Sequence, residues 1–250
     1  MVENITIALK IVNRGDKESA LKYALKVINE SGLRLSGKTE VNGDLAGVLS
    51  NNETIFGVYY AKFYEVVSPL LQQQVSFSSL DPRRDIMDFY EANVTGLDFR
   101  ATAYFTATSE GDRVPYRLSK VTNVYELMNI ATALPSNRIL GINMIRMPEM
   151  YYIAAECLLG EDEDEAVRLF NEVLTHRGLE PLENWPEPQN RLTVSAINDE
   201  RYRELIGEGQ TFFNMKRQNL PIKAMDGSTV NPSRNVYVVP IPDIEYDYRK

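Results

Sequence analysis

Apolar side chains recur at the spacing of an α-helix through much of residues 143–217, and this period limits the folds open to the chain. One stripe covers Met147–Leu158 and a second covers residues 166–174, with Gly160 between them. Two helices joined by a short glycine turn form a helical hairpin. Ala166 and Phe170 have the spacing found in half of a tetratricopeptide hairpin. We therefore predict a hairpin whose first helix begins at Asn143.

Other segments predict a smaller amount of regular structure. Residues 197–216 keep a helical period and predict one long helix. Residues 53–60 are rich in β-branched and aromatic side chains and predict a short strand or an extended buried segment. Residues 92–122 alternate aromatic, glycine and charged residues, so we expect loops and short strands. Residues 236–241 are apolar and run into two prolines, which favours an extended segment at a surface or sheet edge.

The start of the chain also predicts helices. Residues 1–32 carry two apolar helical stripes broken at Gly15, which indicates a second helical hairpin. The two hairpins lie far apart in the sequence, so the chain lacks the tandem units of about 34 residues that define a tetratricopeptide array. We predict an all-α fold with tetratricopeptide-like hairpins, long irregular loops and a few short strands. The whole chain, residues 1–250, is expected to form a single domain.

Composition excludes several classes of function. The net charge is −8, and the densest charge run, residues 161–165, is acidic, so the chain lacks the basic patch of a nucleic-acid binder. Cys157 is the one cysteine and His176 the one histidine, which gives no zinc-site spacing, and we predict no metal or cofactor. Cys157 lies in an apolar helical stretch and is expected to be a buried thiol. No apolar run reaches the ~20 residues that span a bilayer.

Three glutamates recur every four residues in the predicted long helix. Glu200, Glu204 and Glu208 lie on one side of it, with Arg201 and Arg203 among them. Such a row is either a solvated face or a set of pairs with arginine that fix the register of the helix. Two carboxylates at this spacing also meet the crude distance of a glycosidase pair. We favour the structural interpretation, and we expect Gly209 to lie on the packed face, where it permits close helix approach.

Three segments form a set of motifs that occurs in the same order in one known family. The first is Arg146–Glu156 (RMPEMYYIAAE), continued through residues 166–178. The second and most specific is Asn198–Arg217 (NDERYRELIGEGQTFFNMKR), and the third is Val239–Pro242 (VPIP). The set resembles the SusD/RagB family of nutrient-binding lipoproteins. The motif residues to which we assign a structural role are Arg146, Glu149, Glu156, Glu200, Arg201, Glu204, Glu208, Gly209 and Arg217.

The resemblance implies a function without chemistry. Members of this family capture oligosaccharide, or peptide in some relatives, on the external face of a bacterial outer membrane. They present it to a SusC-like TonB-dependent transporter and use no cofactor. The family also has a lipoprotein signal, a lipidated cysteine and an N-terminal helical half, none of which is recognisable in residues 1–250. We therefore expect the chain to correspond to the C-terminal portion of such a protein, with no lipid anchor of its own.

Sugar capture needs aromatic rings for the apolar faces of the sugar and polar groups for its hydroxyls. The aromatic and amide-rich segments outside the predicted core helices, among them Tyr59 and Tyr60, are the candidate platform. Core packing under a loop is the alternative for each ring, and Trp185 would equally well cover the end of a helix. The candidate ligand-binding residues are Tyr64, Phe77, Tyr104, Tyr116 and Trp185.

Two other functions remain open on the sequence alone. A tetratricopeptide-like scaffold would bind a partner peptide in a helical groove. A glycoside hydrolase would need one acid with a raised pKa in a cleft.

Overall fold

The computed structural model describes residues 15–37, 40, 52–60, 86–91, 98–107, 116–118, 120, 141–223 and 227–238. The chain divides into two compact units, residues 1–208 and residues 209–250. The region of helical period at residues 143–217 therefore contributes to both units.

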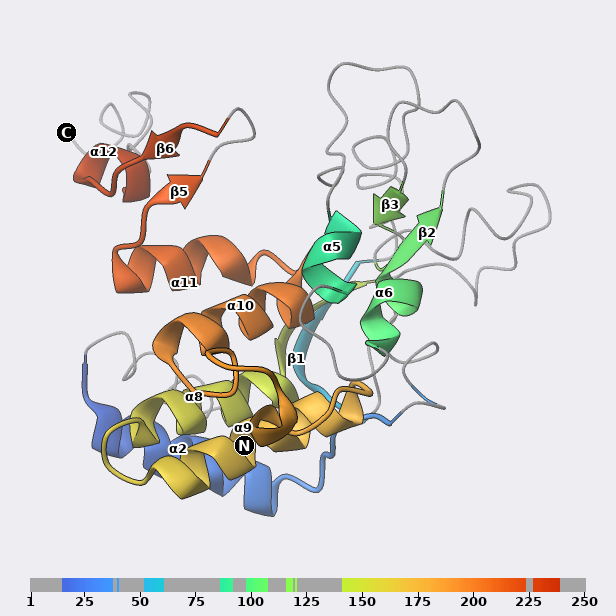
Figure 1. The fold of residues 1–250 in the computed structure, drawn as a ribbon, viewed down its shortest axis with the longest axis vertical. Coiled ribbons are helices and arrows are strands. Elements are labelled where there is room, and N and C mark those ends of the chain that lie inside the picture. Colours follow the sequence, from blue (N-terminus) through green and yellow to red (C-terminus); the bar gives the residue numbers. More distant parts are fainter. Residues whose placement is uncertain are drawn as a thin grey trace. The chain divides into compact units, whose positions relative to one another are not determined.

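Three helices of the first unit pack in a row (Figure 1). They are α2 (Lys17–Glu30), α8 (Met147–Leu158) and α9 (Glu163–His176), and α8 contacts both of the others. The hairpin α8–α9 confirms the helical pair predicted from the apolar stripes. Helix α2 confirms the second half of the hairpin predicted over residues 1–32, whose first half lies outside the described residues.

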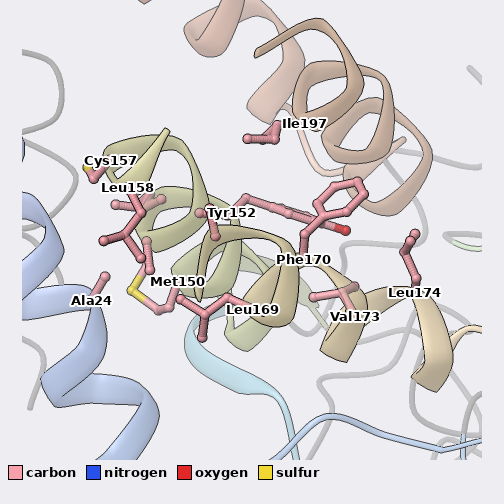
Figure 2. Close-up of a cluster of buried hydrophobic side chains, with 14 of the residues drawn as sticks. Ala24, Met150, Tyr152, Cys157, Leu158, Leu169, Phe170, Val173, Leu174 and Ile197 are labelled. Atoms are coloured by element: carbon pink, nitrogen blue, oxygen red, sulfur yellow. The ribbon is translucent and has the colours of Figure 1, made fainter. Parts of the chain in front are cut away.

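The side chains between these helices form the main apolar core (Figure 2). Ala24 of α2, Met150 of α8 and Leu169 of α9 are all buried, and Ile197 joins them from a later helix. Full burial of a side chain such as leucine or methionine stabilises a fold by about 1.5–3 kcal/mol. Cys157 lies at the edge of this cluster with 4% of its surface exposed, as expected for a buried thiol.

Two strands run beside the core and correct the predicted start of the first hairpin. β1 (Thr54–Tyr59) pairs antiparallel with β4 (Gly141–Arg146), so the strand predicted at residues 53–60 is confirmed. The helix predicted to begin at Asn143 instead begins at Met147, because residues 141–146 are extended and paired with β1. Pro148 lies in the first turn of α8, a position where its missing N–H costs no hydrogen bond.

A smaller apolar cluster is built from short elements. It contains α5 (Ile86–Glu91), α6 (Phe99–Tyr104) and β2 (Phe105–Ala107), which pairs antiparallel with β3 (Tyr116–Leu118). The strands agree with the short strands expected in residues 92–122, whereas the helix α6 was not expected there. Asp98 caps α6 by accepting a hydrogen bond from the amide of Arg100 at 2.9 Å.

The single helix predicted over residues 197–216 is wrong. Helix α10 (Val194–Leu205) ends before Gly207, and a separate helix, α11 (Gln210–Gln218), follows Gly209. Gly207 and Gly209 have φ of 79° and 77°, in the left-handed region that side chains other than glycine seldom adopt. The apolar period of the sequence continues through this break, which is why periodicity alone joined the two helices.

The second unit contains α11 and three short elements. These are β5 (Ile222–Lys223) paired with β6 (Thr229–Val230), and α12 (Arg234–Tyr237). Residues 236 and 237 are helical, so the extended segment predicted over 236–241 is wrong at its start, and residues 239–241 lie outside the described part.

The connection between α9 and α10 includes the 3₁₀ turn η2 (Leu182–Asn184). The described chain is mostly helical with a few short strands, which confirms the predicted fold class.

Candidate functional site

A group of charged side chains is buried in the interior of the first unit. Buried positions are usually occupied by apolar residues. We call this group the ionic cluster. Each member is at most 5% exposed, and five acids face five bases. Its members are Glu53, Asp98, Arg100, Lys120, Arg146, Arg177, Glu200, Arg203, Glu204 and Glu208. Equal numbers of opposite charges satisfy the main condition for burying ions, which is that each has a partner.

Glu204 of α10 lies at the centre of the cluster. Its carboxylate accepts hydrogen bonds from Arg146 Nη1 at 2.7 Å, from Arg177 Nε at 2.9 Å and from Arg100 Nη1 at 3.2 Å. These arginines come from β4, the end of α9 and α6. One carboxylate therefore joins four elements that are far apart in the sequence.

Glu53 completes one side of the cluster. It accepts hydrogen bonds from Arg146 Nη1 at 2.8 Å and from Arg177 Nη2 at 2.9 Å, and also from the amide of Ser36 at 2.7 Å. Arg177 Nη1 donates to the carbonyl of Ser36 at 3.0 Å. The segment that follows α2 is thus fastened to the same two arginines as the segment that precedes β1.

Arg100 links the cluster to the short elements of the smaller core. It makes a two-pronged contact with Asp98, with distances of 2.9 Å from Nε and 2.8 Å from Nη2. Its Nη1 also lies 2.6 Å from Glu200, which in turn accepts a hydrogen bond from Arg203 at 3.0 Å. Paired, planar contacts of this kind are stronger and more directional than those of a lysine.

Glu208 lies on the far side of Arg146. Arg146 Nε donates to it at 3.0 Å, and Lys120 Nζ lies 2.6 Å from the same carboxylate oxygen. Lys120 Nζ also donates to the backbone carbonyl of Glu204 at 2.7 Å and lies 4.1 Å from the centre of the Tyr104 ring. The cluster therefore reaches from the α2 segment to the β2–β3 pair.

The glutamates at the centre of the cluster are held in their charged form. Burial by itself would raise the pKa of Glu204, but Arg177 and Arg146 hold it well below its ordinary value. Burial likewise opposes ionisation of Glu200, whose pKa is nevertheless lowered by Arg100 and Arg203. Both carboxylates are therefore ionised acceptors across the ordinary pH range.

A second, smaller ionic group joins α8 to α10. Arg201 lies 2.5 Å from Glu156 and 3.4 Å from Glu149, and it is 3% exposed. Burial tends to lower the pKa of Arg201, but the two carboxylates raise it above its ordinary value. The motif residues of α8 and α10 thus contact each other directly, as the structural interpretation expected.

Of the two motif residues in the second unit, Gly209 differs from expectation. Gly209 was expected to permit close helix packing, but a side chain there would meet nothing within 4 Å. Its role is conformational, since its φ of 77° begins α11. Arg217 donates to Asn214 at 2.8 Å within the same helix.

The five candidate ligand-binding residues are in different environments. Tyr64 and Phe77 lie outside the described residues. Tyr104 is completely buried and Trp185 nearly so, with its indole N–H donating to the carbonyl of Glu180 at 2.9 Å. Core packing, the alternative weighed for every ring, describes both residues. Tyr116 is partly buried on β3, and its contact with ligand stays a prediction.

The most exposed tyrosines among the described residues lie at the end of β1. Tyr59 is 64% exposed and Tyr60 is 49% exposed, and both belong to the aromatic platform considered from the sequence. Phe56 and Val58 on the same strand are each 44% exposed. Rings presented in this way are available for stacking against an apolar surface.

Six of the ten members of the ionic cluster were not assigned a role from the sequence. They are Glu53, Asp98, Arg100, Lys120, Arg177 and Arg203. Arg177 stands at the end of the first motif's continuation, and Asp98 is a capping residue before a short apolar run, so each had a weak local signal. Lys120 had none, because a lone lysine in a mixed segment is normally exposed.

Neither a metal centre nor a spanning helix is found in the described part of the chain. No three histidine, cysteine, aspartate or glutamate side chains there form a group suited to a metal ion. None of the helices in those ranges has both the length and the apolar character needed to cross a bilayer.

Comparison with known structures shows the same architecture in longer proteins. A SusD superfamily protein of Bacteroides thetaiotaomicron VPI-5482 is 21% identical, with a TM-score of 0.75 over 98% of this chain and 57% of that chain. Surface glycan-binding protein A of Bacteroides uniformis is 19% identical, with a TM-score of 0.68 over 98% of this chain and 58% of that chain.

A related protein was solved with a sugar bound. Surface glycan-binding protein A of Bacteroides thetaiotaomicron, in complex with laminarihexaose, is 20% identical, with a TM-score of 0.67. The alignment covers 99% of this chain and 61% of that protein, so the chain spans about three fifths of the length of these relatives.

The sequence itself also matches a family. A comparison with curated proteins gave no match. Residues 77–245, which are more than half of the chain, match the sequence model of the SusD family. This range includes Asn198–Arg217, the most specific of the three motifs, and most of the ionic cluster. The chain is therefore a member of the SusD family.

Proposed function

We propose that this chain takes part in glycan capture and performs no chemistry on its ligand. The observation that carries the proposal is membership of the SusD family. Its support is the shared fold with surface glycan-binding protein A, which was solved with laminarihexaose bound. The chain spans only part of such proteins, so binding by residues 1–250 alone is part of what is proposed.

Exposed tyrosines are the proposed contact surface. A tyrosine ring offers an apolar face to the C–H groups of a sugar and a hydroxyl that forms hydrogen bonds with sugar hydroxyls. Tyr59 and Tyr60 have the exposure this requires, and Tyr116 is partly exposed on β3. These three residues are better placed to meet a ligand than Tyr104 or Trp185, which are buried.

The ionisation state and the burial of Glu200 and Glu204 argue against their catalysing glycoside hydrolysis. A general acid for glycoside cleavage needs a raised pKa and access to the glycosidic oxygen. Glu200 and Glu204 instead have lowered pKa values and no exposed surface. Their partners are arginines from the fold itself, so they serve as structural anions.

The remaining parts of the proposal come from the family. We place the protein on the external face of a bacterial outer membrane, where it would pass oligosaccharide, or in some relatives peptide, to a SusC-like TonB-dependent transporter. Co-purification of the tagged chain with a TonB-dependent transporter from its native membrane would support this arrangement, and its absence from that complex would contradict it.

Isothermal titration with single-ring variants tests the binding surface. Laminarihexaose is the first probe, followed by a panel of neutral oligosaccharides. We expect Tyr59→Ala and Tyr116→Ala each to weaken binding by about tenfold, the cost of roughly one stacked ring. Tyr23→Ala, on α2, is the matched control and should leave the affinity unchanged. Equal affinity in all three variants would contradict this assignment of the surface.

A further inference from the structure

Tyr116 lies on β3, which pairs with β2, and the two strands meet the smaller core at one end of the pair. β2 begins directly after Tyr104, and β3 ends two residues before Lys120. The amide of Lys120 donates to the carbonyl of Tyr104 at 3.0 Å, which closes the base of the pair. Phe105 pairs with Leu118 next to this base, and Ala107 pairs with Tyr116 at the other end.

The side chain of Lys120 joins this base to the ionic cluster. Its Nζ donates to the carbonyl of Glu204 at 2.7 Å and lies 2.6 Å from Glu208. Its Nζ also lies 4.1 Å from the centre of the Tyr104 ring, and the residue is 2% exposed. Both Glu204 and Glu208 are held independently by Arg146, so the anchoring groups are themselves fixed.

A pair of three-residue strands needs such an anchor. An isolated two-stranded ribbon is marginally stable at best in water. Phe105 and Leu118 supply apolar contacts near the base, but apolar contact alone fixes register less strictly than directed hydrogen bonds do. Tyr116 itself packs against the smaller apolar cluster, and the hydrogen bonds at the base add direction to that apolar contact.

We propose that Lys120 is a positioning residue for ligand capture, which sets the place of Tyr116 by fastening the base of β2–β3 to Glu204 and Glu208. Its effect on affinity rests on the function proposed for Tyr116, whereas its effect on the strand pair does not. Lys120 itself is buried, so the proposed effect on ligand is indirect, through Tyr116.

The charge of Lys120 gives the anchoring a pH dependence. The charged and titratable groups that face it are Glu208, Glu204, Arg146 and Tyr104. Burial lowers the pKa of Lys120 from 10.5 to about 8, with Arg146 in the same direction and Glu208 opposing. The anchored state thus binds fewer protons than a released state with an ordinary lysine. Anchoring should be constant below about pH 8 and become stronger as pH rises above it.

Hydrogen exchange and titration of Lys120→Met test the proposal. At pH 7 we expect the amide protection factors of residues 105–107 and 116–118 to fall about tenfold, with a similar loss of affinity for laminarihexaose. Lys26→Met is the matched control, since Lys26 lies on α2 with its side chain 47% exposed and 4.0 Å from Glu30. The control should change neither quantity.

Two further results keep the outcomes distinct. If Lys120→Met does not fold, the wild-type protein still decides the matter, because the same protection factors should rise between pH 7.5 and pH 9. Unchanged protection in Lys120→Met, or in the wild type over that pH range, overturns the anchoring. Failure of the wild type to bind any oligosaccharide, with the protection lost as expected in Lys120→Met, counts against the proposed function instead.

Discussion

Glu204 is a charged side chain that is completely buried, and its surroundings explain why it can be there. Three arginines donate to one carboxylate, and each arginine has a further acid of its own. The cost of removing these ions from water is large, so their mutual contacts add little net stability compared with an apolar core. What they add is direction, because a guanidinium and a carboxylate meet in few geometries. The cluster thereby fixes the relative positions of α6, β4, α9 and α10.

Removing one partner from the ionic cluster should lower the free energy of unfolding by much more than the whole cluster raises it. Glu204→Gln leaves Arg146 and Arg177 buried with one acid fewer, which typically costs about 3–5 kcal/mol. We expect a loss of this size in the free energy of unfolding measured with urea. Glu172→Gln is the control, because Glu172 is 41% exposed and lies 3.5 Å from Arg168, and it should change stability by less than about 0.5 kcal/mol. Similar losses in the two variants would contradict the structural role of Glu204.

Acid should weaken the fold through the same carboxylates. Glu200 and Glu204 have pKa values below their ordinary 4.5 in the folded chain, so the unfolded chain binds more protons at acidic pH. Their contribution to stability is complete above the unfolded value and is lost as pH falls through the folded values. We expect the free energy of unfolding to fall continuously from about pH 5 to pH 3 at constant salt. A stability that is flat or rising over this interval would contradict buried, ionised glutamates.

Some helices could be predicted from the period of their apolar residues, whereas other elements depend on strand pairing or on backbone conformation. The stripes of α8 and α9 are long, carry a strong period and end at glycines, so their sequence predicts them well. β4 was missed because six residues next to a helix show no period of their own, and its state is set by pairing with β1. α6 was missed for the same reason of length, since six residues are too few to show a stripe.

The break between α10 and α11 depends on glycine conformation, which gives a direct test. Gly209 has a left-handed backbone and open space around it, so a substitution meets strain without a clash. Gly209→Ala should cost about 1–2 kcal/mol, seen as about tenfold faster amide exchange in Gln210–Gln218. Gly209→Asn is the matched variant, because asparagine tolerates this conformation better. Equal exchange in the two variants would show that backbone strain at Gly209 is unimportant.

At the scale of the whole chain, the family and much of the scaffold could be predicted from the sequence, but only part of the candidate site could. Motif residues such as Arg146 and Glu204 were recognisable because their pattern is local to one helix or strand. Their burial was not, because it comes from Glu53, Arg100 and Arg177, which arrive from elements far away in sequence. Tyr104 shows the same limit of prediction. No feature of the local sequence distinguishes a buried ring beside a carboxylate from an exposed ring that contacts a sugar.

A calorimetric titration of the unmodified chain with laminarihexaose and other neutral oligosaccharides, followed by analysis of the recovered sugar, tests glycan capture most directly. We predict saturable binding to at least one oligosaccharide, with the sugar recovered at its original length. Cleavage of the bound sugar would contradict capture without chemistry. Absence of binding across the whole panel would contradict glycan capture by residues 1–250.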